Sequence, residues 1–242
     1  MFRLADKLRQ QVFKHFHSSS SSTKMSPSQY IDYLSMPSSN LFNPDDFILY
    51  PNHFSEKEQE LLLGHSLKKF KRVLGKAIIY QKGHFDGVIE GYRECQASDW
   101  IDYNISNSKN SELRELRELL KDKVYNLVPD VKKWNPIHIL ELAEWGGIRP
   151  HVDNIEYSGK VIMGASLISS AVMIFRHVDD PSCMFSVLLE PGSLYIQKGS
   201  VRFKFTHEIP MQPENHVFRG NLIQKGRRVS LIFRDIQDQK IL

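Results

Sequence analysis

The sequence has very little cysteine and no long apolar run. Its 242 residues include only two cysteines, Cys95 and Cys183, which lie in neither a CxxC pair nor the Cys/His spacing of a zinc site. This excludes a disulfide-rich secreted domain and a zinc finger. No apolar run approaches the roughly 20 residues of a membrane-spanning helix, so we expect no membrane insertion. Hydrophobic residues (41%) and charged residues (25%) are as abundant as in ordinary globular proteins.

The body of the sequence has no excess of charge of either sign. The formal net charge of +4 arises within residues 1–24, which hold five basic residues and one acidic residue. The rest of the chain holds 27 basic and 27 acidic residues. A protein that binds duplex DNA through its phosphates normally has a basic excess in its folded part. We therefore expect that duplex DNA is not a partner.

The first 24 residues have the composition of a mitochondrial transit peptide. They are basic, rich in serine and nearly free of acidic residues, and their apolar residues recur at helical spacing. The apolar positions are Ala5, Leu8, Val12 and Phe16. This pattern predicts import into mitochondria, with the matrix as the destination; a basic terminus without a targeting function is the alternative. Residues 25–43 are rich in Ser and Pro and predict a linker, which leaves 44–242 for the folded domain.

Two amphipathic helices are expected in the first half of that domain. Ser55 and Glu58 form a capping box, which opens a helix that runs to about Leu74. A second helix starts near Ser111, and its apolar stripe comprises Leu113, Leu116, Leu120, Val124 and Leu127. Basic and acidic residues alternate on this second helix, which favours a solvated face over a nucleic-acid-binding patch. The basic residues concerned are Arg114, Arg117, Lys121 and Lys123.

Short strands separated by turn residues are expected from Ile137 onward. The expected strands are 137–143, 148–154, 160–167, 171–177, 184–190, 193–197, 201–207 and 227–235. Turn pairs such as Gly146-Gly147 and Pro191-Gly192 separate them. About eight strands at this spacing are typical of a double-sheet jelly roll. We therefore expect an α+β fold whose jelly-roll (double-stranded β-helix) core is braced by two N-terminal helices.

Two histidines and one aspartate are candidate metal ligands. His151 and Asp153 alternate on an expected strand, so they point to the same face. His207 ends the expected strand 201–207, on an apolar face shared with Val201, Phe203 and Phe205. An imidazole on such a face needs a partner, because an unpaired buried polar group costs roughly 2 kcal/mol or more. Two histidines and one carboxylate form the facial triad that suits non-haem Fe(II). Taken alone, the HxD could be a pair of surface polar residues, and His207 could be a core histidine bonded to a carbonyl.

Two arginines lie on one face of the last expected strand. Arg228, Ser230 and Arg234 alternate with the apolar residues Val229, Leu231 and Phe233. Two guanidinium groups on one strand face need acidic partners or access to solvent. A dicarboxylate such as 2-oxoglutarate would offer one carboxylate for a bidentate grip and a second to chelate iron.

Together these motifs resemble the AlkB-type Fe(II)/2-oxoglutarate dioxygenases. The HxD at His151, the distal His207 and the RxxxxxR from Arg228 to Arg234 occur in that family's order and approximate spacing. Further similar segments are 164–167, 172–175 and 188–195. The tracts 80–94 and 149–155 are most similar to the mitochondrial branch of the family, that of the seventh homologue. The resemblance covers roughly residues 45 to 236.

The resemblance implies a role for each matching residue. It implies that His151, Asp153 and His207 bind Fe(II), and that Arg228 pairs with the distal (C5) carboxylate of 2-oxoglutarate. The remaining members of the implied co-substrate site are Ser230, the hydroxyl of Tyr195, and Arg234, which would contact the C1 carboxylate end or an iron ligand. By position alone, Tyr195 could instead be a packing aromatic.

The sequence departs from the nucleic-acid demethylases of the family in one strand. Leu140 and Leu142 stand where those enzymes usually carry an Asn-x-Tyr pair, and the space for a nucleotide-clamping lid after Trp100 is short. We therefore expect O2-dependent hydroxylation of a protein or a mitochondrial RNA, with decarboxylation of 2-oxoglutarate to succinate. The alternatives are an N-methyl RNA demethylase that releases formaldehyde, and a cupin-like metal-binding interaction module without turnover.

Overall fold

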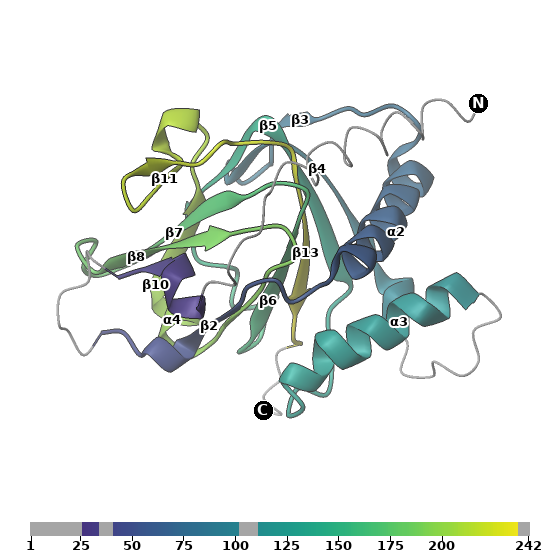
Figure 1. Cartoon of the computed structure of the whole chain (residues 1–242), viewed down its shortest axis with the longest axis horizontal. Coiled ribbons are helices and arrows are strands. Elements are labelled where there is room, and N and C mark those ends of the chain that lie inside the picture. The colour runs from purple at the N-terminus through teal and green to yellow at the C-terminus, as the bar shows by residue number, and fades with distance from the viewer. Residues whose placement is uncertain (1–25, 34–40, 102–110, 237–242) are drawn as a thin grey trace.

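The computed structural model describes residues 26–33, 41–101 and 111–236. They form an α+β fold in which one curled antiparallel sheet has helices packed against its outer side (Figure 1). The strands of this sheet are β1 (Ile31–Asp32), β2 (Phe47–Tyr50), β3 (Gln81–Gly83), β4 (Ile89–Ala97), β5 (Ile137–His151), β6 (Ile162–Leu167), β7 (Ala171–His177), β8 (Met184–Leu189), β9 (Leu194–Gln197), β10 (Phe205–Ile209) and β13 (Arg228–Arg234). A separate hairpin is formed by β11 (Val217–Phe218) and β12 (Asn221–Leu222).

The strand order explains how the sheet closes on itself. Neighbouring strands follow the order β1-β8-β7-β10-β5-β13-β6-β9-β2, and β4 pairs with β5 as well as with β3. β10 pairs with β7 along one edge and with the end of β5 along the other. It therefore joins one half of the sheet (β1, β8 and β7) to the other half (β5, β13, β6, β9 and β2). Sequence-distant strands lie side by side in this way in a jelly roll, which confirms the predicted fold class.

The two predicted helices cover the outer face of the sheet (Figure 1). Helix α2 (Glu56–Leu74) begins at the predicted capping box, in which Ser55 Oγ accepts from the Glu58 amide. Helix α3 (Ser111–Lys123) buries the predicted stripe at Leu116 and Leu120. These side chains form an outer core with residues of α2 and with Ile139 and Leu231 of the sheet. None of the described helices is both long and apolar enough to cross a membrane.

A second core fills the concave side of the sheet. It is rich in aromatic residues, and Phe175 and Phe185 stack within it at 4.6 Å between ring centroids. Alternation along β5 assigns Leu140 to this inner core and Ile139 to the outer core. In β13, Val229, Leu231 and Phe233 belong to the outer core, so the opposite face is left for Arg228, Ser230 and Arg234, as predicted.

The predicted turn at Gly146-Gly147 is wrong. A single strand, β5, runs through these glycines, where two strands, 137–143 and 148–154, were expected. The absence of a side chain at Gly146 lets β4 approach β5 closely. A Cβ on Gly146 would lie 2.3 Å from the carbonyl oxygen of Gly91 in β4. The register between β4 and β5 shifts at this point, as in a β-bulge. β5 can therefore run as one strand from Ile137 to His151.

The predicted strand 201–207 is also wrong in its first part. Residues Gly199–Lys204 form a short helix, α4, and only Phe205–His207 are extended as the start of β10. The Asp46 carboxylate stabilises the start of α4 by accepting from both the amide and the hydroxyl of Ser200. The expected common face is lost as a result, since Phe203 is 44% exposed whereas Val201 is buried.

The order of elements differs from the expectation that two helices precede all strands. β1 and β2 come before α2, and the hairpin β3–β4 lies between α2 and α3. Within the expected linker 25–43, Tyr30 and Ile31 are buried, and β1 pairs with β8. Part of this segment is therefore attached to the sheet. The transit peptide predicted at residues 1–24 lies outside the described residues.

The contact at Gly146 generates a stability prediction. We expect Gly146→Ala to lower the free energy of unfolding by about 1–3 kcal/mol, because the new methyl group meets the β4 backbone. Gly64→Ala in α2 is the matched control, since nothing lies within 4 Å of its Cβ position. Alanine there should leave stability unchanged or raise it by up to about 1 kcal/mol. Urea unfolding measures both variants, and equal stabilities would contradict the role of the glycine.

Candidate active site

Three side chains suited to metal binding meet where the end of β5 lies against β10. His151 is the last residue of β5 and is paired with His207, and Asp153 follows two residues later. The potential ligand atoms of the three residues all lie within 4.8 Å of one another. The two imidazole rings are 4.3 Å apart between centroids. The structure thus brings together the three residues that the sequence singled out as metal-ligand candidates.

The two oxygens of Asp153 have different surroundings. Oδ1 accepts from Nε and Nη2 of Arg234 at 3.2 and 2.7 Å, and Oδ2 faces His207 Nε2 at 3.6 Å. Burial favours a raised pKa, but the charge and hydrogen bonds of Arg234 hold the pKa of Asp153 well below its usual range. Burial, aided by His151, lowers the pKa of His207 to about 3. An ionised carboxylate and a neutral imidazole are the forms that bind a metal ion.

Arg228 is a buried cation surrounded by hydroxyl groups. Its side chain, only 4% exposed, donates from Nε to Ser166 Oγ at 3.1 Å and from Nη1 to Ser230 Oγ at 3.2 Å. Among residues 26–33, 41–101 and 111–236, no carboxylate lies within ion-pair distance of this guanidinium. Burial lowers the pKa of Arg228, which reflects the cost of keeping its charge away from water.

Tyr195 is buried within electrostatic range of both Arg228 and Asp153. The positive charge of Arg228 and the negative charge of Asp153 both act on its phenol, while burial raises the pKa of Tyr195 to about 12. The ring fits against Gly164, its partner on β6, where a Cβ would come within 2.3 Å of a ring carbon. The hydroxyl therefore stays protonated and can donate a hydrogen bond.

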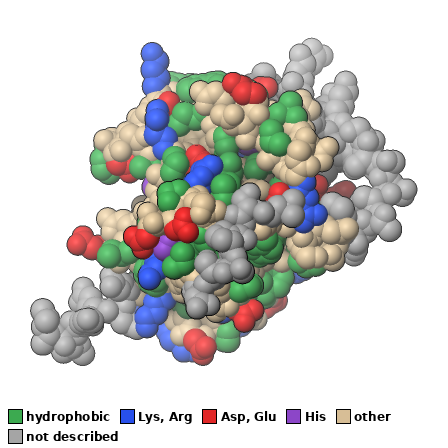
Figure 2. All heavy atoms as spheres, turned by 90° about the vertical axis from the view of Figure 1, so that its left-hand side faces the viewer, with side chains coloured by type: hydrophobic (Ala, Val, Ile, Leu, Met, Phe, Trp, Pro, Cys, Tyr) green, Lys and Arg blue, Asp and Glu red, His purple; other side chains and the backbone are tan. Residues whose placement is uncertain are grey.

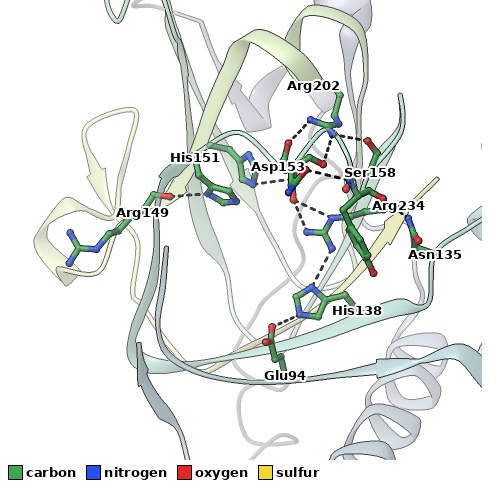
Figure 3. Close-up of polar contacts among 12 residues, drawn as sticks. Glu94, Asn135, His138, Arg149, His151, Asp153, Ser158, Arg202 and Arg234 are labelled. Carbon is green, nitrogen blue, oxygen red and sulfur yellow. Dashed lines mark hydrogen bonds and ion pairs between the residues drawn. The ribbon is translucent and has the colours of Figure 1, made fainter. Parts of the chain in front are cut away.

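Arg202 is a site residue that sequence reasoning missed. It is 1% exposed and donates to the backbone oxygens of Asp153 at 3.0 Å and Ser158 at 3.2 Å, which ties down the segment after β5 (Figure 3). The predicted strand 201–207 assigned this side chain to the outward face. Only the helical conformation of α4 turns it inward, and no local sequence signal indicated that helix.

His138 was also missed, although it lies next to Arg234. Its Nδ1 is 3.3 Å from Arg234 Nη1, and its Nε2 is 2.7 Å from Glu94 Oε2. Leu140 and Leu142, two and four residues further along β5, are buried in the inner core. The leucine pair therefore presents an apolar surface at this position.

Comparisons with known proteins agree with this geometry. The family model described as the 2OG-Fe(II) oxygenase superfamily matches residues 46–234. The chain is 33% identical over 194 residues to "Alpha-ketoglutarate-dependent dioxygenase alkB homolog 7, mitochondrial" of Mus musculus. It is 34% identical over 194 residues to the Bos taurus protein of the same name. Each of these matches covers 80% of this chain and 80% of the relative.

The fold has a counterpart among solved structures. The structure of OsALKBH1 superposes with a TM-score of 0.53 at 15% identity, covering 78% of this chain and 96% of that chain. At this identity the similarity concerns the fold alone, whereas the family follows from the sequence matches. The chain therefore belongs to the 2OG-Fe(II) oxygenase superfamily and, within it, to the alkB-homologue dioxygenases, which use Fe(II) and 2-oxoglutarate (α-ketoglutarate).

Proposed function

We propose that this chain is a mitochondrial dioxygenase that hydroxylates a protein or a mitochondrial RNA. The proposed iron ligands are His151, Asp153 and His207, and the proposed 2-oxoglutarate site comprises Tyr195, Arg228, Ser230 and Arg234. When bound, iron supplies the redox chemistry by which one atom of O2 enters a substrate C–H bond, while the other enters succinate as 2-oxoglutarate loses CO2.

The observation that carries the proposal is the buried guanidinium of Arg228. A cation held away from water without an anionic partner is costly, and two serine hydroxyls leave its charge uncompensated. A carboxylate of 2-oxoglutarate would supply that charge and accept two parallel hydrogen bonds. The protonated hydroxyl of Tyr195 would donate a further bond to the same carboxylate.

The three ligand candidates fit Fe(II) in type and in protonation state. Two imidazoles and one carboxylate occupy one face of an octahedron and leave three positions for 2-oxoglutarate and O2. Arg234 keeps Asp153 ionised and engages only Oδ1, so that Oδ2 is available toward His207. Arg202 fixes the backbone of the segment that carries Asp153.

Removing the charge of Arg228 tests the co-substrate site. We expect Arg228→Gln to weaken 2-oxoglutarate binding at least about tenfold, because loss of one partner of a buried charge pair costs about 2–5 kcal/mol. The same change removes a desolvated charge, so the thermal stability of the free protein should stay equal or rise. Calorimetric titration of the Mn(II)-loaded protein with 2-oxoglutarate measures the affinity.

The control for this experiment is Arg72→Gln in α2. The Arg72 side chain is 64% exposed and pairs with Asp99, away from the candidate site, so its replacement should leave 2-oxoglutarate affinity unchanged. Unchanged affinity together with a loss of stability in Arg228→Gln would mean that Arg228 is a structural residue. That result would overturn the proposed grip.

A protein substrate is favoured over a nucleic acid by the surface charges. On the face drawn in Figure 2, acidic and basic side chains are interspersed with apolar ones. Two of the four basic residues of α3 are engaged within the protein: Arg117 is buried and donates to the Asp99 carbonyl, and Lys123 donates to the His53 carbonyl. The other two, Arg114 and Lys121, are exposed and alternate with acidic residues. A face on which acidic side chains accompany the basic ones offers no uniform positive potential for an array of phosphates.

Product analysis on three substrates tests this assignment. The iron-loaded enzyme is incubated with 2-oxoglutarate and a mitochondrial protein extract, N-methylated single-stranded RNA, or N-methylated duplex DNA. We expect peptides that gain one oxygen atom with the wild type and not with Asp153→Ala. Formaldehyde release from RNA would favour the demethylase alternative, and fast, stoichiometric repair of duplex DNA would contradict the proposal. Absence of succinate formation on all three would indicate a metal-binding module without turnover.

The proposed mitochondrial location rests on two independent observations. The composition of residues 1–24 is that of a transit peptide, and both mammalian relatives carry the word mitochondrial in their names. We propose the matrix as the compartment, because basic amphipathic presequences of this type direct import there.

A further inference from the structure

Four side chains form a continuous polar chain that ends at the metal-ligand candidate Asp153 (Figure 3). Glu94 Oε2 lies 2.7 Å from His138 Nε2, and His138 Nδ1 lies 3.3 Å from Arg234 Nη1. Arg234 then contacts Asp153 Oδ1 through Nε and Nη2. Neither Glu94 nor His138 belongs to the proposed iron or 2-oxoglutarate site, so their function requires a separate explanation.

Strand register brings the members of this chain together. β5 lies between β4 and β13, and His138 is opposite Gln96 on one neighbour and Ile232 on the other. Glu94 and Arg234 are each two residues away from those partners, on the same face as His138. Diagonal neighbours of this kind are within reach of long side chains. Three adjacent strands therefore hold the arrangement.

The donors and acceptors fix the protonation of His138. An arginine can only donate, so Nδ1 must offer its lone pair to Arg234 Nη1. Nε2 then carries the proton and donates to the Glu94 carboxylate, and this hydrogen bond holds the pKa of Glu94 below its usual range. A neutral imidazole thus accepts from a cation on one side and donates to an anion on the other.

This position keeps two opposite charges apart. The charge of Arg234 already acts on Glu94 across His138, and the other Glu94 oxygen lies 3.6 Å from His84. Without the imidazole, the Glu94 carboxylate would lose its closest donor and Arg234 Nη1 would lose its acceptor. The Arg234 guanidinium could then pair with either of two carboxylates, Glu94 or Asp153. A guanidinium drawn toward Glu94 would leave Asp153 without its anchor.

We infer that His138 is a positioning residue that keeps Arg234 on Asp153 by occupying the competing carboxylate of Glu94. The inference rests on the proposed function, because the consequence of this positioning is a correctly oriented metal ligand. Partners of metal ligands typically change metal affinity or activity about 10- to 100-fold when they are replaced. Arg234 contacts the metal-ligand candidate Asp153 directly, and His138 would act on Asp153 indirectly, through Arg234.

Mn(II) binding in the presence of 2-oxoglutarate tests the inference without turnover. We expect His138→Leu to weaken Mn(II) binding about tenfold or more. Adding Glu94→Gln to that variant should restore most of the affinity, because the competing charge is gone. His138→Gln should also retain affinity, since its amide can accept from Arg234 and donate to Glu94. Free Mn(II) is followed by electron paramagnetic resonance during titration of the full chain.

Rescue by the second substitution separates positioning from a general packing defect. The double variant carries the same leucine, so a merely structural defect would persist in it. Wild-type affinity in His138→Leu, or no recovery in the double variant, would overturn the inference. His138→Ala gives the same comparison if leucine prevents folding. His65→Leu in α2, on the outer side of the sheet, is the matched control and should bind Mn(II) like the wild type.

Failure of the inference and failure of the proposed function give different results. If the wild-type protein binds no Mn(II), the proposed metal site is wrong, and the inference that rests on it falls with it. If the wild type binds Mn(II) and His138→Leu binds it equally well, only the role of His138 is contradicted.

Discussion

The pairing of β5 with β10 is the contact on which the rest of the site depends. It joins the two halves of the curled sheet and sets His151 directly opposite His207. β5 reaches this point because it passes unbroken through Gly146, where the close approach of β4 excludes a side chain. The same strand carries His138, so it links the polar chain around Arg234 with the histidine pair.

Several charged side chains are buried in the interior of the jelly roll, among them Asp153, Arg202 and Arg228. Asp153 and Arg234 compensate each other, and Arg202 is satisfied by backbone carbonyl groups. Arg228 has hydroxyl partners and a protonated phenol nearby. Buried ionic groups of this kind are seldom a net source of stability. The proposed function accounts for this arrangement as a pre-formed environment for an anionic ligand beside a cation.

Sequence reasoning was most successful where the answer depends on local geometry. Alternation along β13 predicted which residues face inward, and the capping box at Ser55 predicted where α2 begins. It failed where a distant contact decides the conformation, as at α4, which is stabilised by Asp46 from another part of the chain. Arg202 was missed because it lies on α4, which the sequence predicted to be a strand. His138 was missed because its partners Glu94 and Arg234 lie on the two adjacent strands and become neighbours only through strand register.

The most direct test of this account is a crystal structure of the chain with Mn(II) and 2-oxoglutarate. The account predicts a metal ion bonded to His151, Asp153 and His207, and a carboxylate of 2-oxoglutarate within hydrogen-bond distance of the Arg228 guanidinium. A metal ion bound by other residues, or an Arg228 side chain that still has only hydroxyl partners in the presence of the ligand, would contradict it.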